Sequence, residues 1–233
     1  MKYWDNVADN LQSLMRDGYC FLPPIKGVFP LDNIFMQCEL EIGDRTYAEN
    51  LDAHRKFVLE SGISSILSPA LFSLARDTYG YRGSEDNQYH VSRLVRPGDI
   101  SEGYRGHFDS HLFTLVMPIK IPACEKVDRA GNLLFFPTAR REPRNEISNF
   151  AGKLNFKRYA SKAGFERLAQ ICQQKTASFD DSRPLLFLGR QTFHGNMPLN
   201  ASFNSGRLTL LTHFFDPSPP WGIGAILRKI RTR

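Results

Sequence analysis

The stretch 107–121, with the sequence HFDSHLFTLVMPIKI, decides the fold. Its second part, Leu112–Ile121, is rich in β-branched and aromatic residues and predicts a β-strand. On extended backbone, residues i and i+2 point to the same side. His107 and Asp109 can therefore reach one point in space at the start of this strand, while Phe108 faces away from it.

Short predicted strands with Gly and Pro turns between them fill the second half of the chain. They cover 89–95, 112–121, 132–136, 185–188 and 208–215. Helices are expected earlier: one that Asp5 caps and that ends near Gly18, then 32–40, 51–60 and one that Pro69 opens. Ser161 is expected to cap an inserted helix with Phe165, Leu168 and Ile171 on one face. The fold class is therefore α+β, mainly β: a double-sheet jelly roll (double-stranded β-helix, cupin-like) with flanking helices.

A chain of 233 residues that is 42% hydrophobic is expected to form one domain with a sizeable core. We expect residues 1–233 to be this domain, with a helical part over about 1–80, the jelly-roll core over about 88–216 and a basic tail at 217–233. No apolar run approaches the roughly 18 residues of a membrane span, and the N-terminus lacks the apolar region of a signal peptide. The four cysteines are widely spaced, which favours reduced thiols and a cytoplasmic location.

A second histidine completes a candidate metal site. His194 lies in 192–196, TFHGN, which follows the apolar run Leu185–Leu188. Two imidazoles and one carboxylate on one face of an ion bind iron(II) and leave coordination positions open. We therefore predict that His107, Asp109 and His194 bind Fe(II) and are catalytic. An HxD pair alone is a weak signal, and the later histidine strengthens it.

Over residues 91–215 this order of parts resembles the phytanoyl-CoA dioxygenase-like branch of the Fe(II)/2-oxoglutarate oxygenases. The resemblance rests on the HxD pair, the later His194 and Arg207 about a dozen residues after it. It implies that 2-oxoglutarate and O2 take the open positions on the iron. A substrate is then hydroxylated while succinate and CO2 are released. The sequence departs from the family pattern at 137–141, PTARR, on the substrate side.

Arg207 opens the apolar strand 208–215, which is unusual for a surface arginine. Its planar fork suits a carboxylate, and we expect it to bind the far carboxylate of 2-oxoglutarate. Thr209 points to the same side of the strand and is expected to help. His213 shares this parity, but a core histidine with satisfied hydrogen bonds is the simpler interpretation. His54 and His90 are interpreted as structural.

Candidate substrate contacts lie near the HxD pair and in the later basic cluster. They are Tyr104, Arg105, His111, Arg140 and Arg141. The basic cluster also holds Arg144, Lys153, Lys157 and Arg158, and is either an ordinary solvated surface or the mouth of the active site.

A net charge of +6 favours a small, anionic substrate. No nucleic-acid motif is present, so no nucleic-acid partner is expected. The tail 221–231, WGIGAILRKIR, is apolar and then basic. It is either a helix packed on the domain or a peripheral contact with an anionic membrane at its cytoplasmic face.

Two other functions fit the same residues. A zinc-type metallohydrolase or lyase would use the metal to activate water and would need neither Arg207 nor oxygen. A non-catalytic binding module on a jelly-roll scaffold would bind no metal.

Overall fold

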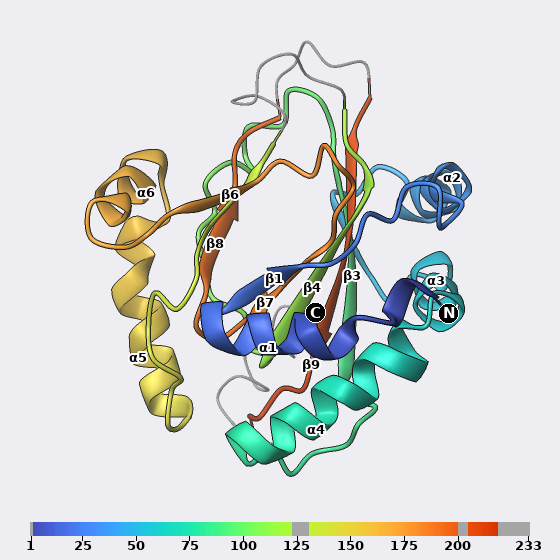
Figure 1. Cartoon of the computed structure of the whole chain (residues 1–233). Coiled ribbons are helices and arrows are strands. Elements are labelled where there is room, and N and C mark those ends of the chain that lie inside the picture. Colours follow the sequence, from blue (N-terminus) through green and yellow to red (C-terminus); the bar gives the residue numbers. More distant parts are fainter. Residues whose placement is uncertain (1, 123–130, 200–204, 219–233) are drawn as a thin grey trace.

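The computed structural model describes residues 2–122, 131–199 and 205–218. Two antiparallel sheets form its centre (Figure 1). The larger has six strands in the order β1-β7-β4-β9-β3-β2, and the smaller has three in the order β6-β5-β8. Strands that are far apart in sequence lie side by side, as expected of the predicted jelly roll.

The strands are β1 (Tyr19–Phe21), β2 (Tyr47–Glu49), β3 (Gln88–Val95), β4 (Phe113–Lys120), β5 (Leu133–Phe136), β6 (Lys175–Ala177), β7 (Leu185–Leu188), β8 (Phe193–Asn196) and β9 (Arg207–Phe214). The helices are α1 (Val7–Asp17), α2 (Leu31–Ile42), α3 (Asp52–Glu60), α4 (Ser68–Tyr79), α5 (Glu146–Phe156) and α6 (Lys162–Ala169). Short helical turns lie at η1 (Lys2–Trp4), η2 (Ile63–Leu67) and η4 (Lys157–Tyr159).

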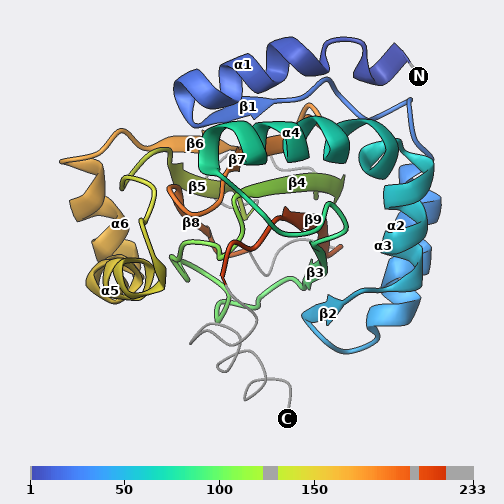
Figure 2. The ribbon, with the colours of Figure 1, turned by 90° about the horizontal axis from the view of Figure 1, so that it is seen from below.

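Strand alternation divides the core into three layers. Side chains of one parity, such as Val116, Phe187 and Phe135, meet between the two sheets. The side chains of opposite parity on the larger sheet pack beneath α1–α4, which cover its outer face (Figure 2). On the smaller sheet, the side chains of opposite parity, including Phe136 and Phe193, pack beneath α5 and α6. The space between the sheets can therefore hold a site, because helices cover both outer faces.

The predicted elements agree with this architecture, with differences at helix ends. Helix α1 stops at Gly18, which is left-handed as predicted, but its N-cap is Asn6 and not Asp5, and no side chain caps it. The hydroxyl of Ser161 accepts a hydrogen bond from Gly164 N, as expected of a cap. Ile171, predicted on the buried face, instead follows the end of α6 and is 70% exposed. The sequence prediction also omitted α5 and the short strands β1, β2, β6 and β8.

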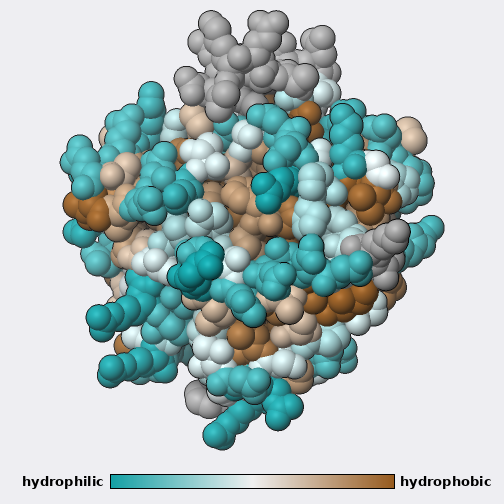
Figure 3. Space-filling model, in the orientation of Figure 1, coloured by the Kyte–Doolittle hydropathy of each residue, from teal (hydrophilic) through white to brown (hydrophobic). Residues whose placement is uncertain are grey.

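The molecular surface is mostly hydrophilic on the face seen in Figure 3, with small separate hydrophobic patches. Within the described residues, no single helix is long and apolar enough to cross a membrane; only the bent pair Asp52–Glu60 and Ile63–Tyr79 passes by length and composition. The predicted tail contact falls at 219–233, outside the described residues, and it stays a prediction.

Candidate metal centre

Backbone hydrogen bonds fix the two halves of the predicted metal site against each other. His107 N donates to His194 O and His194 N donates to His107 O, both at 3.0 Å. Asp109 N donates to Gly189 O at 3.0 Å. A Cβ atom added to Gly189 would lie only 3.1 Å from Asp109 Cβ and 2.8 Å from Thr114 Oγ1. Glycine is therefore needed there for the carboxylate to keep its place.

The three predicted ligands converge. His107 Nε2 lies 3.6 Å from Asp109 Oδ1, and His194 Nε2 lies 3.8 Å from Asp109 Oδ2. All three ligand atoms lie within 4.8 Å of one another. Ligand atoms on one face of a metal, each about 2.1 Å from it, lie about 3 Å apart. The two His–Asp separations are less than 1 Å longer than this, so small side-chain movements would bring the three groups onto one divalent ion.

The hydrogen bonds of both histidines leave the correct nitrogen for a metal. His107 Nδ1 lies 2.9 Å from Arg105 O, and His194 Nδ1 lies 3.1 Å from Thr192 O. A carbonyl oxygen only accepts hydrogen bonds, so each Nδ1 carries the proton. Each Nε2 then keeps its lone pair. Such contacts orient metal-binding histidines and fix their tautomer.

Asp109 is buried and held by side chains that the sequence prediction did not assign to the site. The hydroxyl of Thr114 donates to Asp109 Oδ2 at 2.6 Å. His213 Nδ1 lies 3.1 Å from the same hydroxyl and 3.7 Å from Asp109 Oδ2. Thr114 pairs with His213 across β4 and β9, and both point between the sheets. Their inward parity on two predicted strands could have indicated these contacts.

The electrostatics favour neutral imidazoles and an ionised carboxylate. Burial lowers the pKa of His194 and of His213. The surrounding protein and the adjacent His194 ring lower the pKa of His107 as well, although 58% of its side-chain surface is exposed. Burial alone would raise the pKa of Asp109, but the three imidazoles and the Thr114 hydroxyl outweigh it and hold that pKa below its usual range. At neutral pH the ligands are thus in the protonation states that a metal requires.

Arg207 begins β9 and is 3% exposed. Its Nη1 donates to Gly131 O, and its guanidinium lies 5.8 Å from the Phe179 ring centre. No carboxylate among the described residues pairs with it. Asn196 Nδ2 donates to the same carbonyl at 3.2 Å. Asn196 lies two residues beyond His194 on β8, about 7 Å along the strand. The Arg207 guanidinium therefore lies next to a side chain that is two residues along β8 from the ligand His194.

The predicted substrate residues separate into two groups. His111 is buried near the ligands, stacked on Tyr89 at 5.9 Å and 5.3 Å from His213 between ring centres. Tyr104 instead packs on Phe165, on the outer face of the smaller sheet. Arg105 pairs with Glu102 at 2.6 Å.

The arginines of the basic cluster do not converge on the metal ligands. Arg140 bonds to Arg190 O at 2.7 Å and to Asn149 Oδ1 at 2.7 Å, and its guanidinium lies 3.9 Å from the ring centre of Phe108. Arg141 is exposed. Phe108 points away from the metal ligands, as predicted.

A basic side chain that was not in the predicted site approaches it instead. Lys153, on α5, donates from Nζ to Ser110 Oγ at 3.0 Å, and Ser110 directly follows the ligand Asp109. Burial lowers the pKa of Lys153 to about 8. Because α5 was not predicted, nothing in the sequence pattern separated Lys153 from the other basic residues of its cluster.

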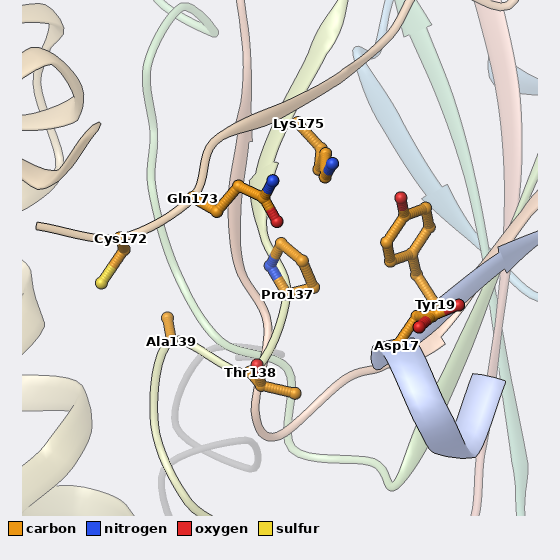
Figure 4. A pocket seen from close by; sticks show the side chains of 8 residues that line it. All are labelled: Asp17, Tyr19, Pro137, Thr138, Ala139, Cys172, Gln173 and Lys175. Atoms are coloured by element: carbon orange, nitrogen blue, oxygen red, sulfur yellow. The ribbon is translucent and has the colours of Figure 1, made fainter. Parts of the chain in front are cut away.

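A hollow of about 510 Å³ lies elsewhere, where α1 and β1 approach the segment after β5 (Figure 4). Asp17 and Tyr19 line one side of it, Cys172 and Ala139 line the other, and Lys175 lies between them. It contains none of the predicted site residues. We therefore place the chemistry at the three ligands and not in this hollow.

Comparison with known proteins supports the fold. No family model matches the chain, and no curated protein matches it. Among solved structures, a prolyl-4-hydroxylase from Pseudomonas putida has a TM-score of 0.53 at 12% identity, covering 90% of this chain and 94% of that one. The non-heme alpha ketoglutarate dependent carbocyclase SnoK from nogalamycin biosynthesis has a TM-score of 0.53 at 14% identity, covering 94% and 90%. The epimerase SnoN in complex with Fe3+, alpha ketoglutarate and nogalamycin RO has a TM-score of 0.50 at 14% identity, covering 90% and 83%. The chain therefore has the jelly-roll fold of these enzymes.

Proposed function

We propose that this protein is a non-haem Fe(II)- and 2-oxoglutarate-dependent oxygenase. One observation carries the proposal: Arg207, a buried arginine without a carboxylate partner among the described residues, shares a hydrogen-bond acceptor with Asn196, which is two residues along β8 from His194 of the His–Asp–His set. Burying an unpaired guanidinium is costly, and a bound carboxylate would offset that cost. Activation of water by zinc does not itself require such a residue.

Each residue of the site has a separate role. His107, Asp109 and His194 would hold the iron on one face, and Arg207 would hold the far carboxylate of 2-oxoglutarate, with Thr209 beside it. Together with O2, iron and 2-oxoglutarate supply the oxidation of a substrate C–H bond, with release of succinate and CO2. Thr114 fixes the Asp109 carboxylate, and the exposed side of His107 is where a substrate would approach.

The finer assignment is to the phytanoyl-CoA dioxygenase-like branch, acting as a hydroxylase on a small anionic molecule. The distance in sequence from His194 to Arg207 supports the branch. The net charge of +6 and the approach of Lys153 to Ser110 support an anionic substrate. Once a screen for succinate release finds a substrate, Lys153→Met should raise its KM, whereas Lys157→Met, an exposed neighbour, should not.

The deciding experiment is an anaerobic titration of Fe(II) with 2-oxoglutarate, followed through the weak visible charge-transfer band of the chelate. We expect a band that needs both components and that disappears in His194→Ala. The matched control is His90→Gln, which changes a partly buried histidine on the other face of the sheet and should keep the band. Tight zinc binding without a band would favour the hydrolytic function, and no metal binding would favour a binding module.

A further inference from the structure

A second buried arginine lies beside Arg207. Arg93, on β3, is 9% exposed and pairs directly with Thr209 on β9, while its neighbour Val95 pairs with Arg207. Arg93, Thr209 and Arg207 have the parity that faces between the sheets. Diagonal neighbours of this kind on paired strands are within reach of each other's long side chains.

Hydrogen bonds show that the two guanidinium groups border the same small space. Arg93 Nη1 donates to Asn196 Oδ1, and Asn196 Nδ2 donates to Gly131 O at 3.2 Å. Arg207 Nη1 donates to that carbonyl too. Burial first, and then the charge of Arg93, lower the pKa of Arg207 to about 9, which agrees with two cations close together.

One carboxylate balances only one of these cations. Glu102 Oε2 lies 3.0 Å from Arg93 Nη2, and Glu102 Oε1 lies 2.6 Å from Arg105 Nη1. Arg105 is 63% exposed, so water screens its charge. Among the described residues, the buried groups here are thus two arginines and one glutamate.

Arg93 also has an unused donor. Its buried Nε–H has no hydrogen-bond partner within the described part of the chain. A buried donor without an acceptor is costly, and native proteins rarely keep one without a ligand, water or function. This donor and the unmatched charge both point to a bound anion.

We propose that Arg93 is a second anchor for the far carboxylate of 2-oxoglutarate, acting beside Arg207, and that Glu102 holds Arg93 in position. The inference rests on the proposed function and extends it from one guanidinium to two. A site with two guanidiniums binds a 2-oxo acid with a far carboxylate in preference to one with an apolar end. Without Glu102, Arg93 would repel Arg207 and turn away from it.

The test compares two probes on the Fe(II)-loaded protein without oxygen. 2-Oxoglutarate has the far carboxylate, and 2-oxobutanoate lacks it; the dissociation constant of each is measured through the charge-transfer band. Arg93→Met should raise the dissociation constant of 2-oxoglutarate by about 10- to 100-fold, the effect of losing a charge-assisted hydrogen bond. It should change the dissociation constant of 2-oxobutanoate by less than about twofold, since only the far carboxylate is affected. Arg105→Met is the control, because it removes the other, exposed partner of Glu102 and should leave both constants near wild type.

Two further variants separate the loss of the anchor from misfolding of the protein. Arg93→Lys keeps the charge without the planar fork and should give an intermediate constant. The double variant Arg93→Met/Glu102→Gln also neutralises the carboxylate, which the single change leaves with only Arg105 and the Tyr47 hydroxyl as partners. An unchanged 2-oxoglutarate constant in folded Arg93 variants, with a weakened one in Arg207→Met, would overturn the second anchor and leave the proposed function intact. Equal weakening of both probes would also overturn it, because Arg93 would then act on the metal site. Absence of the band in the wild-type protein would instead remove the proposed function, and the anchor with it.

Discussion

Two groups of histidines lie on opposite faces of the larger sheet, and only one of them has the arrangement of a metal site. On the inner face, His213 joins His107, His194 and Asp109. On the outer face, His54 of α3 packs against His90 of β3 with 5.1 Å between ring centres. Burial lowers the pKa values of the histidines in both groups, so neither burial nor a shifted pKa separates them.

The partners of the ring nitrogens make the difference. His54 is enclosed by hydroxyls, with Nδ1 3.1 Å from Ser92 Oγ and Nε2 3.4 Å from Thr212 Oγ1. Both of its nitrogens are thus used inside the protein. His107 and His194 each use only Nδ1, on a backbone carbonyl, and present Nε2 to a carboxylate. A free Nε2 and an anion, rather than a cluster of imidazoles, identify the metal site.

The largest expected effect comes from removing the anion. Asp109→Ala should weaken binding of a divalent metal by more than about 100-fold, since ligand loss exceeds the 10- to 100-fold cost of losing a residue that supports a ligand. Iron-dependent turnover should disappear, and His107→Ala should behave in the same way. Metal content after dialysis and titration of the apoprotein measure the effect. Full metal affinity in Asp109→Ala would move the site elsewhere.

Part of this distinction could be predicted from the sequence and part could not. The HxD pair and Arg207 lie next to or on strands that are visible in the sequence, and His194 follows the predicted strand Leu185–Leu188, so their convergence was predictable. Strands β1, β2 and β6 have three residues each, and β8 has four residues without apolar alternation, so none of them shows a period-2 pattern. They were missed for that reason.

Helix α5 was missed for a different reason. Its capping box pairs Asn145 with Ser148 and so lacks the usual Ser/Thr and Glu/Gln signature. Its exposed face carries Ile147, Phe150 and Leu154, so its apolar pattern does not mark a buried stripe. Which basic side chain of this region approaches the site depends on packing between distant segments, which sequence spacing cannot give.

Two threonines, one beside each histidine group, allow a sharper test of the difference between the groups. The expected effect on metal binding is smaller than that of losing Asp109. Thr114 donates to Asp109 on the inner face, and the Thr212 hydroxyl is hydrogen-bonded to His54 and to His90 on the outer face. Both threonines are fully buried. Thr114→Val should weaken metal binding by about 10- to 100-fold. Thr212→Val should leave metal affinity unchanged and lower the free energy of unfolding by about 1–3 kcal/mol, because the imidazoles lose a hydrogen-bond partner.

Metal titration and urea unfolding of both variants measure these effects, and the two substitutions remove the same atom type from neighbouring strands. If Thr212→Val weakened metal binding as much as Thr114→Val does, the two histidine groups would act as one unit. The distinction between the faces would then be wrong.

The smallest expected effect is a pH dependence that belongs to the outer group. Burial first, and then the charges of His213 and Arg55, lower the pKa of His90 from 6.5 to about 4. A histidine whose pKa is depressed by folding contributes stability above pH 6.5 and loses it as the pH falls toward 4. Between pH 7 and pH 5 the loss from His90 should be about 2 kcal/mol.

Urea unfolding of the metal-free protein at both pH values should therefore show a smaller acid-induced loss in His90→Gln than in wild type, by about that amount. Metal affinity at pH 7 should not change, because the substituted side chain would lie on the face away from the ligands. An identical pH dependence in the two proteins would mean that His90 is protonated without cost in the folded state. The outer group would then not be the closed, neutral cluster that its hydroxyl partners indicate, and the contrast with the open Nε2 atoms of the inner group would rest on geometry alone.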